Sequence, residues 1–194
     1  MAMALHSTDT SWGLIARLFH WIMAIMILLM LAGGLRMANT TDLIAQFEMV
    51  QQHKSIGFTV FVLAVLRLIW RWRSPATPRL PGDMPRWQVA ASHISHVMLY
   101  ILIVAIPISG WLMVTSSPLN DPGAYPTQIR NMVFGLFEMP DPFATGNAAL
   151  SKTLRDIHEI LGKLLMLTLL AHIGASLKHH FIDKDTILRR MIRG

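Results

Sequence analysis

Histidine is the residue type in this chain that is best suited to chemistry. The sequence has nine histidines in 194 residues and no cysteine. The lack of cysteine excludes disulfides, iron–sulfur clusters, thiol nucleophiles and covalent haem attachment. Neutral imidazole is the commonest metal ligand among side chains. Any metal centre in this protein is therefore expected to depend on imidazole coordination.

The spacing of two histidines predicts that they share one face of a helix. His158 and His172 are 14 residues apart. In an α-helix this spacing is roughly 21 Å along the axis and within about 40° of the same azimuth. One helix would then present two imidazoles at two separate levels, and each would need a partner on another helix.

The elements that position these histidines are expected to be membrane-spanning helices. The chain is 53% hydrophobic and only 14% charged, with a mean hydropathy of +0.46, whereas about a quarter of a soluble domain is charged. A span needs about 20 predominantly apolar residues. Four segments meet this need, at about residues 14–36, 53–72, 88–114 and 156–178. The sequence predicts an all-α membrane protein in which residues 1–194 form a single domain, a bundle of four transmembrane helices.

The connectors between the spans are expected to be non-helical. Prolines interrupt the segment from Ser74 to Pro81, and the segment from Ser116 to Gly146 is rich in Pro, Gly, Asp and Asn. Residues of these types end helices and form turns.

Lysine and arginine indicate how the chain crosses the membrane. With the N-terminus inside, 11 of the 17 basic residues lie on the inner side, five lie outside and Lys163 lies within the fourth span. The positive-inside rule then places both termini in the cytoplasm. The first apolar segment exceeds a signal-peptide core and contains Arg17 and His20, so it is expected to remain as a span. The basic residues cluster at span ends, which indicates lipid rather than nucleic acid as the partner.

In this orientation, four of the histidines form two pairs, and the members of each pair lie at the same depth in the membrane. His20 in the first span and His172 in the fourth both lie near the inner face. His53 and His158 open the second and fourth spans near the outer face. Two imidazoles from facing helices at one level are what a six-coordinate haem iron needs. We therefore predict two haems within the bundle, with His20 and His172 on the inner iron and His53 and His158 on the outer iron.

Small residues support this choice of ligands. The residue four positions after each ligand is small, which leaves room for a porphyrin, although helix packing also favours small residues. These residues are Ala24, Gly57, Gly162 and Ser176. His93 and His96 compete for the inner iron, but Val97 and Tyr100 follow them at the same spacing. The alternatives for these two histidines are a role beside the inner haem, at a quinone, or in structure only.

Cations near the expected ligands have two readings. Arg17 and Arg67 lie near the inner pair and could bind haem propionates, or they could extend to lipid headgroups. Three interpretations are open for the cations near the outer pair: they could bind haem propionates, extend to lipid headgroups, or contact the substrate. The candidates there for a catalytic role are Lys54, Arg155 and Lys163.

Three further histidines are expected to lie at the membrane surface without a functional role. They lie near the chain ends or span ends, where the headgroup region accepts imidazole, and they are His6, His179 and His180. Thr168, four residues before His172, is expected to orient that imidazole.

Several motifs resemble those of the bacterial cytochrome b561 family over nearly the whole chain. They are Phe19-His-Trp21, His53-Lys-Ser-Ile-Gly57, Ala91-Ser-His-Ile-Ser-His96, Asp156-Ile-His158, Ala171-His172 and the tail from Leu177 to Asp185. The resemblance implies a four-helix inner-membrane protein with two b-type haems, held by His20, His53, His158 and His172. It also implies electron transfer between a donor and the quinone pool, and one branch of the family is similar to a superoxide oxidase that reduces ubiquinone.

The expected function is therefore one-electron transfer across the bacterial inner membrane. With both axial positions filled, the irons would act as relays rather than oxygen-activating centres. The donor could be superoxide on the periplasmic side, and the acceptor could be ubiquinone. One alternative is a haem-bearing anchor subunit for a partner dehydrogenase. A histidine-lined metal-ion transporter is less favoured, because the only acid within a span is Glu159, at its outer edge.

Overall fold

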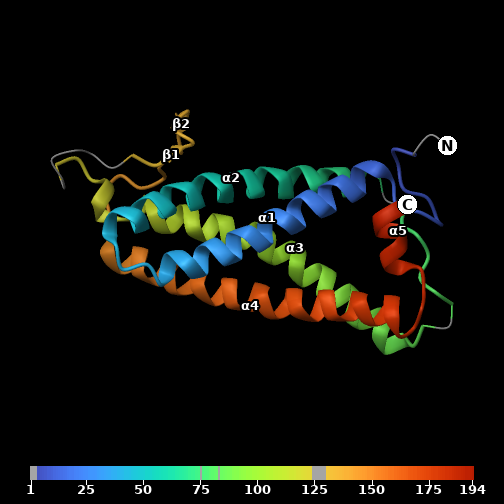
Figure 1. Cartoon of the computed structure of the whole chain (residues 1–194). Coiled ribbons are helices and arrows are strands. Elements are labelled where there is room, and N and C mark those ends of the chain that lie inside the picture. The colour runs from blue at the N-terminus through green and yellow to red at the C-terminus, as the bar shows by residue number, and fades with distance from the viewer. Residues whose placement is uncertain (1–3, 75, 83, 124–129) are drawn as a thin grey trace. The chain divides into compact units, whose positions relative to one another are not determined.

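Four long helices make up most of the computed structural model, which describes residues 4–74, 76–82, 84–123 and 130–194. Each is long and apolar enough to cross a membrane. They are α1 (Leu14–Ala38), α2 (Leu43–Arg73), α3 (Arg86–Thr115) and α4 (Ala148–Phe181), as Figure 1 shows. The prediction of a four-helix membrane bundle is confirmed. Of the connectors expected to be non-helical, Pro75 and residues 124–129 lie outside the described residues.

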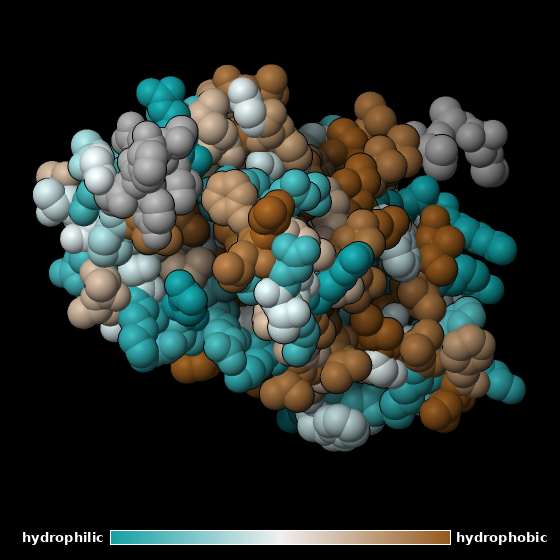
Figure 2. Space-filling view, turned by 60° about the vertical axis from the view of Figure 1, so that its left-hand side comes forward, coloured by the Kyte–Doolittle hydropathy of each residue, from teal (hydrophilic) through white to brown (hydrophobic). Residues whose placement is uncertain are grey.

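The surface of the helices is strongly apolar. Leu29 is 66% exposed on α1, and Leu167 and Leu170 are 66% and 70% exposed on α4. Figure 2 shows apolar side chains over much of the visible face. In water such a surface would be costly, whereas hydrocarbon accepts it and requires only that the backbone be hydrogen-bonded internally, as a helix does.

Helices α2 and α4 begin earlier than the apolar segments expected from the sequence. Helix α2 starts at Leu43 instead of near residue 53, and α4 starts at Ala148 instead of near residue 156. Side chains cap both starts, because the Asp42 carboxylate accepts from the Ile44 amide at 2.9 Å and Asn147 accepts from the Leu150 amide at 3.0 Å. The 31 residues of α2 would extend about 46 Å. This exceeds the hydrocarbon thickness of about 30 Å, so hydropathy alone identifies only part of the helix.

The chain forms two compact units, and each contains a segment of all four long helices. Unit 1 consists of Met1–Ile25, Leu63–Ile101 and Leu165–Gly194, and unit 2 of Met26–Val62 and Leu102–Leu164. His20 and His172 therefore belong to unit 1, and His53 and His158 belong to unit 2.

In unit 1, the short C-terminal helix α5 (Ile187–Arg193) packs back on the start of the chain (Figure 1). The Trp21 indole donates to the Met191 carbonyl at 3.0 Å. The Arg190 guanidinium donates to the Arg79 carbonyl at 2.7 Å, and Arg79 in turn pairs with Asp9 at 2.8 Å. These bonds join α5, the first turns of α1 and the connector before α3.

In unit 2, the segment between α3 and α4 contains structure that its composition does not reveal. A 3-10 turn (Pro118–Asn120) follows α3, and two short strands, β1 (Met132–Val133) and β2 (Phe137–Glu138), form an antiparallel hairpin. The Trp111 indole on α3 donates to the Pro140 carbonyl within the segment at 2.8 Å, and the Asn147 amide donates to the Ser116 carbonyl at 2.8 Å, which joins the two ends of the segment.

Candidate functional site

The two histidine pairs predicted from depth are present as close pairs of rings. In unit 1, His20 on α1 and His172 on α4 have ring centroids 6.4 Å apart, with an interplanar angle of 54°. In unit 2, His53 on α2 and His158 on α4 have centroids 6.3 Å apart, with an angle of 79°. All four side chains are partly buried.

The ring separations fit two imidazoles on opposite sides of one metal ion. A metal–imidazole bond is about 2.0–2.1 Å long and a ring centre lies about 1.1 Å from each ring nitrogen, so centroids trans to each other are about 6.3 Å apart. Both observed separations are within about 0.1 Å of this value. The donor set is also suitable, because bis-histidine coordination holds haem iron in many b-type centres.

His96 also contacts the inner pair but fits a different role. Its ring centroid is 5.3 Å from that of His172, about 1 Å closer than trans coordination of one iron requires. Its Nδ1 lies 2.8 Å from the Ser92 carbonyl oxygen. A carbonyl can only accept, so Nδ1 carries the proton and Nε2 keeps a lone pair. His96 therefore presents a hydrogen-bond acceptor beside the inner pair, and both His96 and His93 are exposed.

Of the two arginines expected near the inner pair, Arg67 is the one that lies beside it. Its Nη2 is 3.4 Å from Nδ1 of His20, and its guanidinium lies 5.4 Å from the centre of the Tyr100 ring. A guanidinium only donates, and a metal-bound imidazole also donates from the nitrogen opposite the metal. With His20 coordinated through Nε2, Arg67 would therefore need another acceptor, such as a carboxylate. Arg17 instead lies against Gly194 in α5's C-cap.

The outer pair has a supporting arrangement on α3 that the sequence reading did not identify. Nδ1 of His158 lies 3.1 Å from the Ile106 carbonyl oxygen and 3.0 Å from Ser109 Oγ, and the Ser109 hydroxyl donates to the same carbonyl at 2.8 Å. Because the carbonyl only accepts, Nδ1 carries the proton and Nε2 is available as a ligand. A serine 49 residues away in sequence carries no local signal for this contact.

Glycines allow the outer histidines to approach neighbouring helices. A Cβ added to Gly110 would lie 3.0 Å from Cε1 of His158, closer than side chains normally pack. A Cβ at Gly34 on α1 would lie 3.5 Å from Cε1 of His53, which is ordinary contact. Gly110, which the sequence reading did not assign to the site, is therefore the glycine that the position of His158 requires.

The glycines predicted to leave room beside the ligands differ in how much space surrounds them. A Cβ on Gly57 would lie 3.5 Å from the methyl group of Met30, whereas a Cβ on Gly162 would meet no described atom within 4 Å. The same is true of Gly174 on α4. Gly162 therefore has space beside it, one helical turn from His158.

The cations expected at the outer site differ in how far their charge is compensated. Lys163 pairs with Glu159 at 2.6 Å, and Lys152 pairs with Asp156 at 3.0 Å. The partly buried Lys54 donates to the neutral amide oxygen of Asn131 at 2.9 Å, so this contact leaves its charge uncompensated. Arg155 is exposed on the first half of α4.

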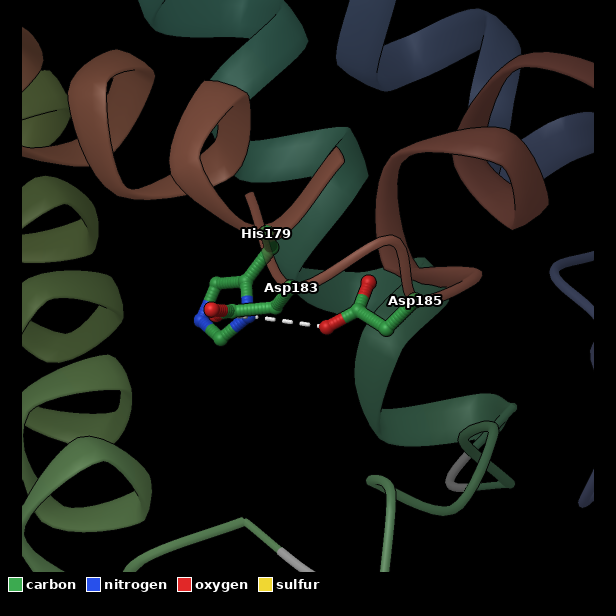
Figure 3. A group of neighbouring side chains, drawn as sticks. All are labelled: His179, Asp183 and Asp185. Carbon is green, nitrogen blue, oxygen red and sulfur yellow. Dashed lines mark ion pairs between the residues drawn. The ribbon is translucent and has the colours of Figure 1, made fainter. Parts of the chain in front are cut away.

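The histidines expected at the membrane surface contact other side chains. His6 stacks on Trp70 with ring centroids 5.0 Å apart. At the end of α4, Nδ1 of His179 is 3.1 Å from Asp183 and 2.8 Å from Asp185. Figure 3 shows these three side chains together. These three groups are close enough for a metal ion. However, Lys178 already binds both oxygens of Asp183, at 2.6 and 2.9 Å. The cluster is therefore a network of charged side chains at the turn between α4 and α5.

A bundle of membrane-spanning helices that brings histidines from different helices into close pairs is typical of membrane b-type cytochromes. Comparison of the sequence with known proteins identifies the family within this class. The chain matches the sequence model described as "Prokaryotic cytochrome b561" over residues 11–194. It belongs to the prokaryotic cytochrome b561 family, whose members transfer electrons in the membrane with b-type haem.

Three curated relatives are similar over most of their lengths. Cytochrome b561 homolog 2 of Escherichia coli (strain K12) is 33% identical over 193 residues, which cover 98% of this chain and 95% of the relative. Cytochrome b561 homolog 1 of the same organism is 30% identical, with 89% and 92% covered. A Yersinia pestis protein named "Probable superoxide oxidase CybB" is 27% identical, with 89% and 90% covered.

Replacement of Gly110 by valine is expected to displace His158 and lower the haem content. The added side chain would overlap the imidazole, and such overpacking costs about 1–3 kcal/mol. The haem-to-protein ratio, measured by pyridine haemochrome, checks this. Gly33→Val is the control, because a Cβ on Gly33 would meet no described atom within 4 Å. Full haem content in the Gly110 variant would contradict the assignment.

Proposed function

We propose that this protein is a di-haem cytochrome that passes single electrons from a donor at the outer face of the bacterial inner membrane to the quinone pool. The observation that carries the proposal is the pair of histidine contacts at 6.4 and 6.3 Å, each within one unit. Each separation fits one bis-imidazole iron, so the chain offers two such sites. A metal-ion transporter fits less well, because Glu159 pairs with Lys163.

In this proposal, His20 and His172 hold the inner haem, and His53 and His158 hold the outer one. Haem iron supplies a reversible one-electron couple when bound. Arg67 lies beside His20 and is the best-placed cation for an inner propionate, with Arg17 a second candidate. Gly57 and Gly162 keep side-chain atoms away from the faces that carry the outer ligands.

The surroundings of the two pairs favour electron flow from the outer to the inner haem. The Arg67 cation lies close to the inner pair, and a nearby positive charge favours the less positive, reduced iron. His158 donates from Nδ1 to the Ile106 carbonyl, which makes its imidazole a stronger donor and favours the oxidised iron. Both effects would raise the potential of the inner haem relative to the outer one, whereas the Lys54 charge beside His53 would act in the opposite direction.

Lys54 supports an anionic electron donor at the outer haem. It directly follows His53, is partly buried, and is hydrogen-bonded to a neutral amide. A cation in this position attracts an anion toward the adjacent ligand. Superoxide is a donor of this kind, since its one-electron oxidation gives dioxygen, and the Yersinia pestis relative carries the name of a probable superoxide oxidase.

A quinone near the inner pair is consistent with His96. Its proton on Nδ1 is bound to the Ser92 carbonyl, so Nε2 can accept a hydrogen bond or a proton. Quinone reduction consumes protons, which a histidine can deliver. With both termini in the cytoplasm, as the distribution of basic residues predicts, these protons would come from the inner side.

Single histidine variants test the number of haems and their ligands. His172→Leu is expected to remove only the inner haem, and His158→Leu only the outer one, whereas His96→Leu should retain both. Pyridine haemochrome counts and redox titrations measure these outcomes. The haem that remains in His158→Leu should have the higher midpoint potential. Loss of a haem from the His96 variant would contradict the ligand assignment, and one haem per wild-type chain would contradict the proposal.

The space beside Gly162 provides a second test. Gly162→Leu should lose outer-haem absorbance with His158 intact, because the side chain would enter the space next to the ligand. Helix propensity alone predicts no harm, since leucine is the better helix former. Gly174→Leu is the matched control, because this glycine lies on the same helix with similar open space. An unchanged spectrum and midpoint potential in the Gly162 variant would show that its small size serves only helix packing.

Neutralisation of Lys54 tests the anionic donor. Lys54→Gln should slow haem reduction by enzymatically generated superoxide several-fold and weaken its dependence on ionic strength, while reduction by dithionite reaches the same end point. Stopped-flow absorbance at the haem bands measures the rate. Lys152→Gln is the control, because Asp156 already compensates that charge. Equal rates in the wild type and both variants would exclude Lys54 from donor capture.

A further inference from the structure

The tip of the β1–β2 hairpin carries large apolar side chains that the protein does not cover. Phe134, Leu136 and Phe137 are 58%, 80% and 46% exposed. The ion pair between Arg130 and Glu138, with N and O 3.7 Å apart, lies at the open end of the hairpin. The hairpin is therefore polar at its open end and apolar at its turn.

The turn itself uses a residue that turn chemistry disfavours. Phe134 and Gly135 have φ of +48° and +72°, and the Leu136 amide donates to the Val133 carbonyl at 2.9 Å. Val133 pairs with Phe137, so three residues connect the strands, and the β-turn from Val133 to Leu136 has both central residues in the left-handed region, where asparagine and glycine are preferred. A bulky aromatic residue is unfavourable there. Neither the backbone nor internal packing accounts for an exposed phenylalanine at this position.

Contacts with α2 fix the level of the hairpin within unit 2. The Phe134 amide donates to Ser55 Oγ at 2.9 Å, and the Phe137 ring lies 5.7 Å from the Phe58 ring. Lys54 binds Asn131 at the start of the hairpin. The hairpin therefore lies along the part of α2 that includes residues 54–58.

This part of α2 lies beside apolar turns of α1. A Cβ on Gly34 would contact His53, and a Cβ on Gly57 would contact Met30. Residues 30–34 precede Arg36, the basic residue in the last turn of α1 and the expected boundary of the hydrocarbon. The hairpin tip is thus level with these apolar turns, which we expect to face lipid.

We propose that this hairpin is a membrane-interface anchor, with Phe134, Leu136 and Phe137 inserted into the lipid of the outer leaflet. Lipid is favoured over a protein partner because the exposed tip is level with the apolar surface of α1 and α2. The arrangement also holds Asn131 against Lys54 at the lipid boundary. The inference does not depend on the haem number or the electron donor.

Site-directed spin labelling tests this proposal directly, because the chain has no cysteine of its own. Leu136→Cys and Thr145→Cys are each labelled with a nitroxide in haem-loaded protein, in nanodiscs of phosphatidylethanolamine and phosphatidylglycerol. Thr145 is an exposed polar residue of the same inter-helix segment. The ratio of collisions with dioxygen to collisions with a water-soluble nickel chelate should be several-fold higher at position 136. Equal ratios would overturn the proposal, as would an immobile label at position 136 that neither reagent reaches, which would indicate a protein contact.

Phe134→Asn provides a second, independent measurement. Asparagine suits the turn and removes the aromatic side chain, so the hairpin should persist while its affinity for lipid falls. In the Phe134→Asn background, the label at position 136 should become several-fold more accessible to the nickel chelate, with the haem-to-protein ratio unchanged. No change in accessibility would show that Phe134 does not anchor the hairpin in lipid.

Discussion

Hydrocarbon offers no hydrogen-bond partner, so an imidazole on a membrane helix needs one from the protein or from a ligand. This constraint organises both units. His158 donates to the Ile106 carbonyl, His96 donates to the Ser92 carbonyl, and His20 lies beside Arg67. In each case one ring nitrogen is occupied or approached by the protein, and the other can serve a ligand. The helices and their small residues are arranged around these few polar groups.

Much of this arrangement is encoded locally and could be predicted from the sequence. Apolar length identified the four helices, and the depth of each histidine within its span gave the two pairs, although His96 at the same level also contacts His172. His20 and His172 meet because the antiparallel α1 and α4 bring them to one level, and His53 and His158 meet because each lies in the first half of α2 and α4, which run in the same direction. Depth in the membrane varies along one axis only, so the position of a residue within its span is enough to predict it.

The details around the rings could not be predicted in the same way, because they depend on how helices are rotated and how loops return. Ser109 and Gly110 meet His158 only through the packing of α3 on α4. The first turns of α2 contain Gln46 and Glu48, which hydropathy assigns to a loop but Asp42 caps as a helix. The hairpin has only two residues in each strand, too few for an alternating pattern to stand out.

The division of the chain between the two units has a consequence for biogenesis. Every residue of unit 2, including His53 and His158, has been synthesised once the chain reaches Leu164. Unit 1 combines the first helix with residues 165–194, and Trp21 and Arg79 bond to α5 near the end of the chain. The ribosome therefore synthesises all of unit 2 before the part of unit 1 that contains His172. His20 on the first helix can meet His172 only after residues that follow unit 2 have been made.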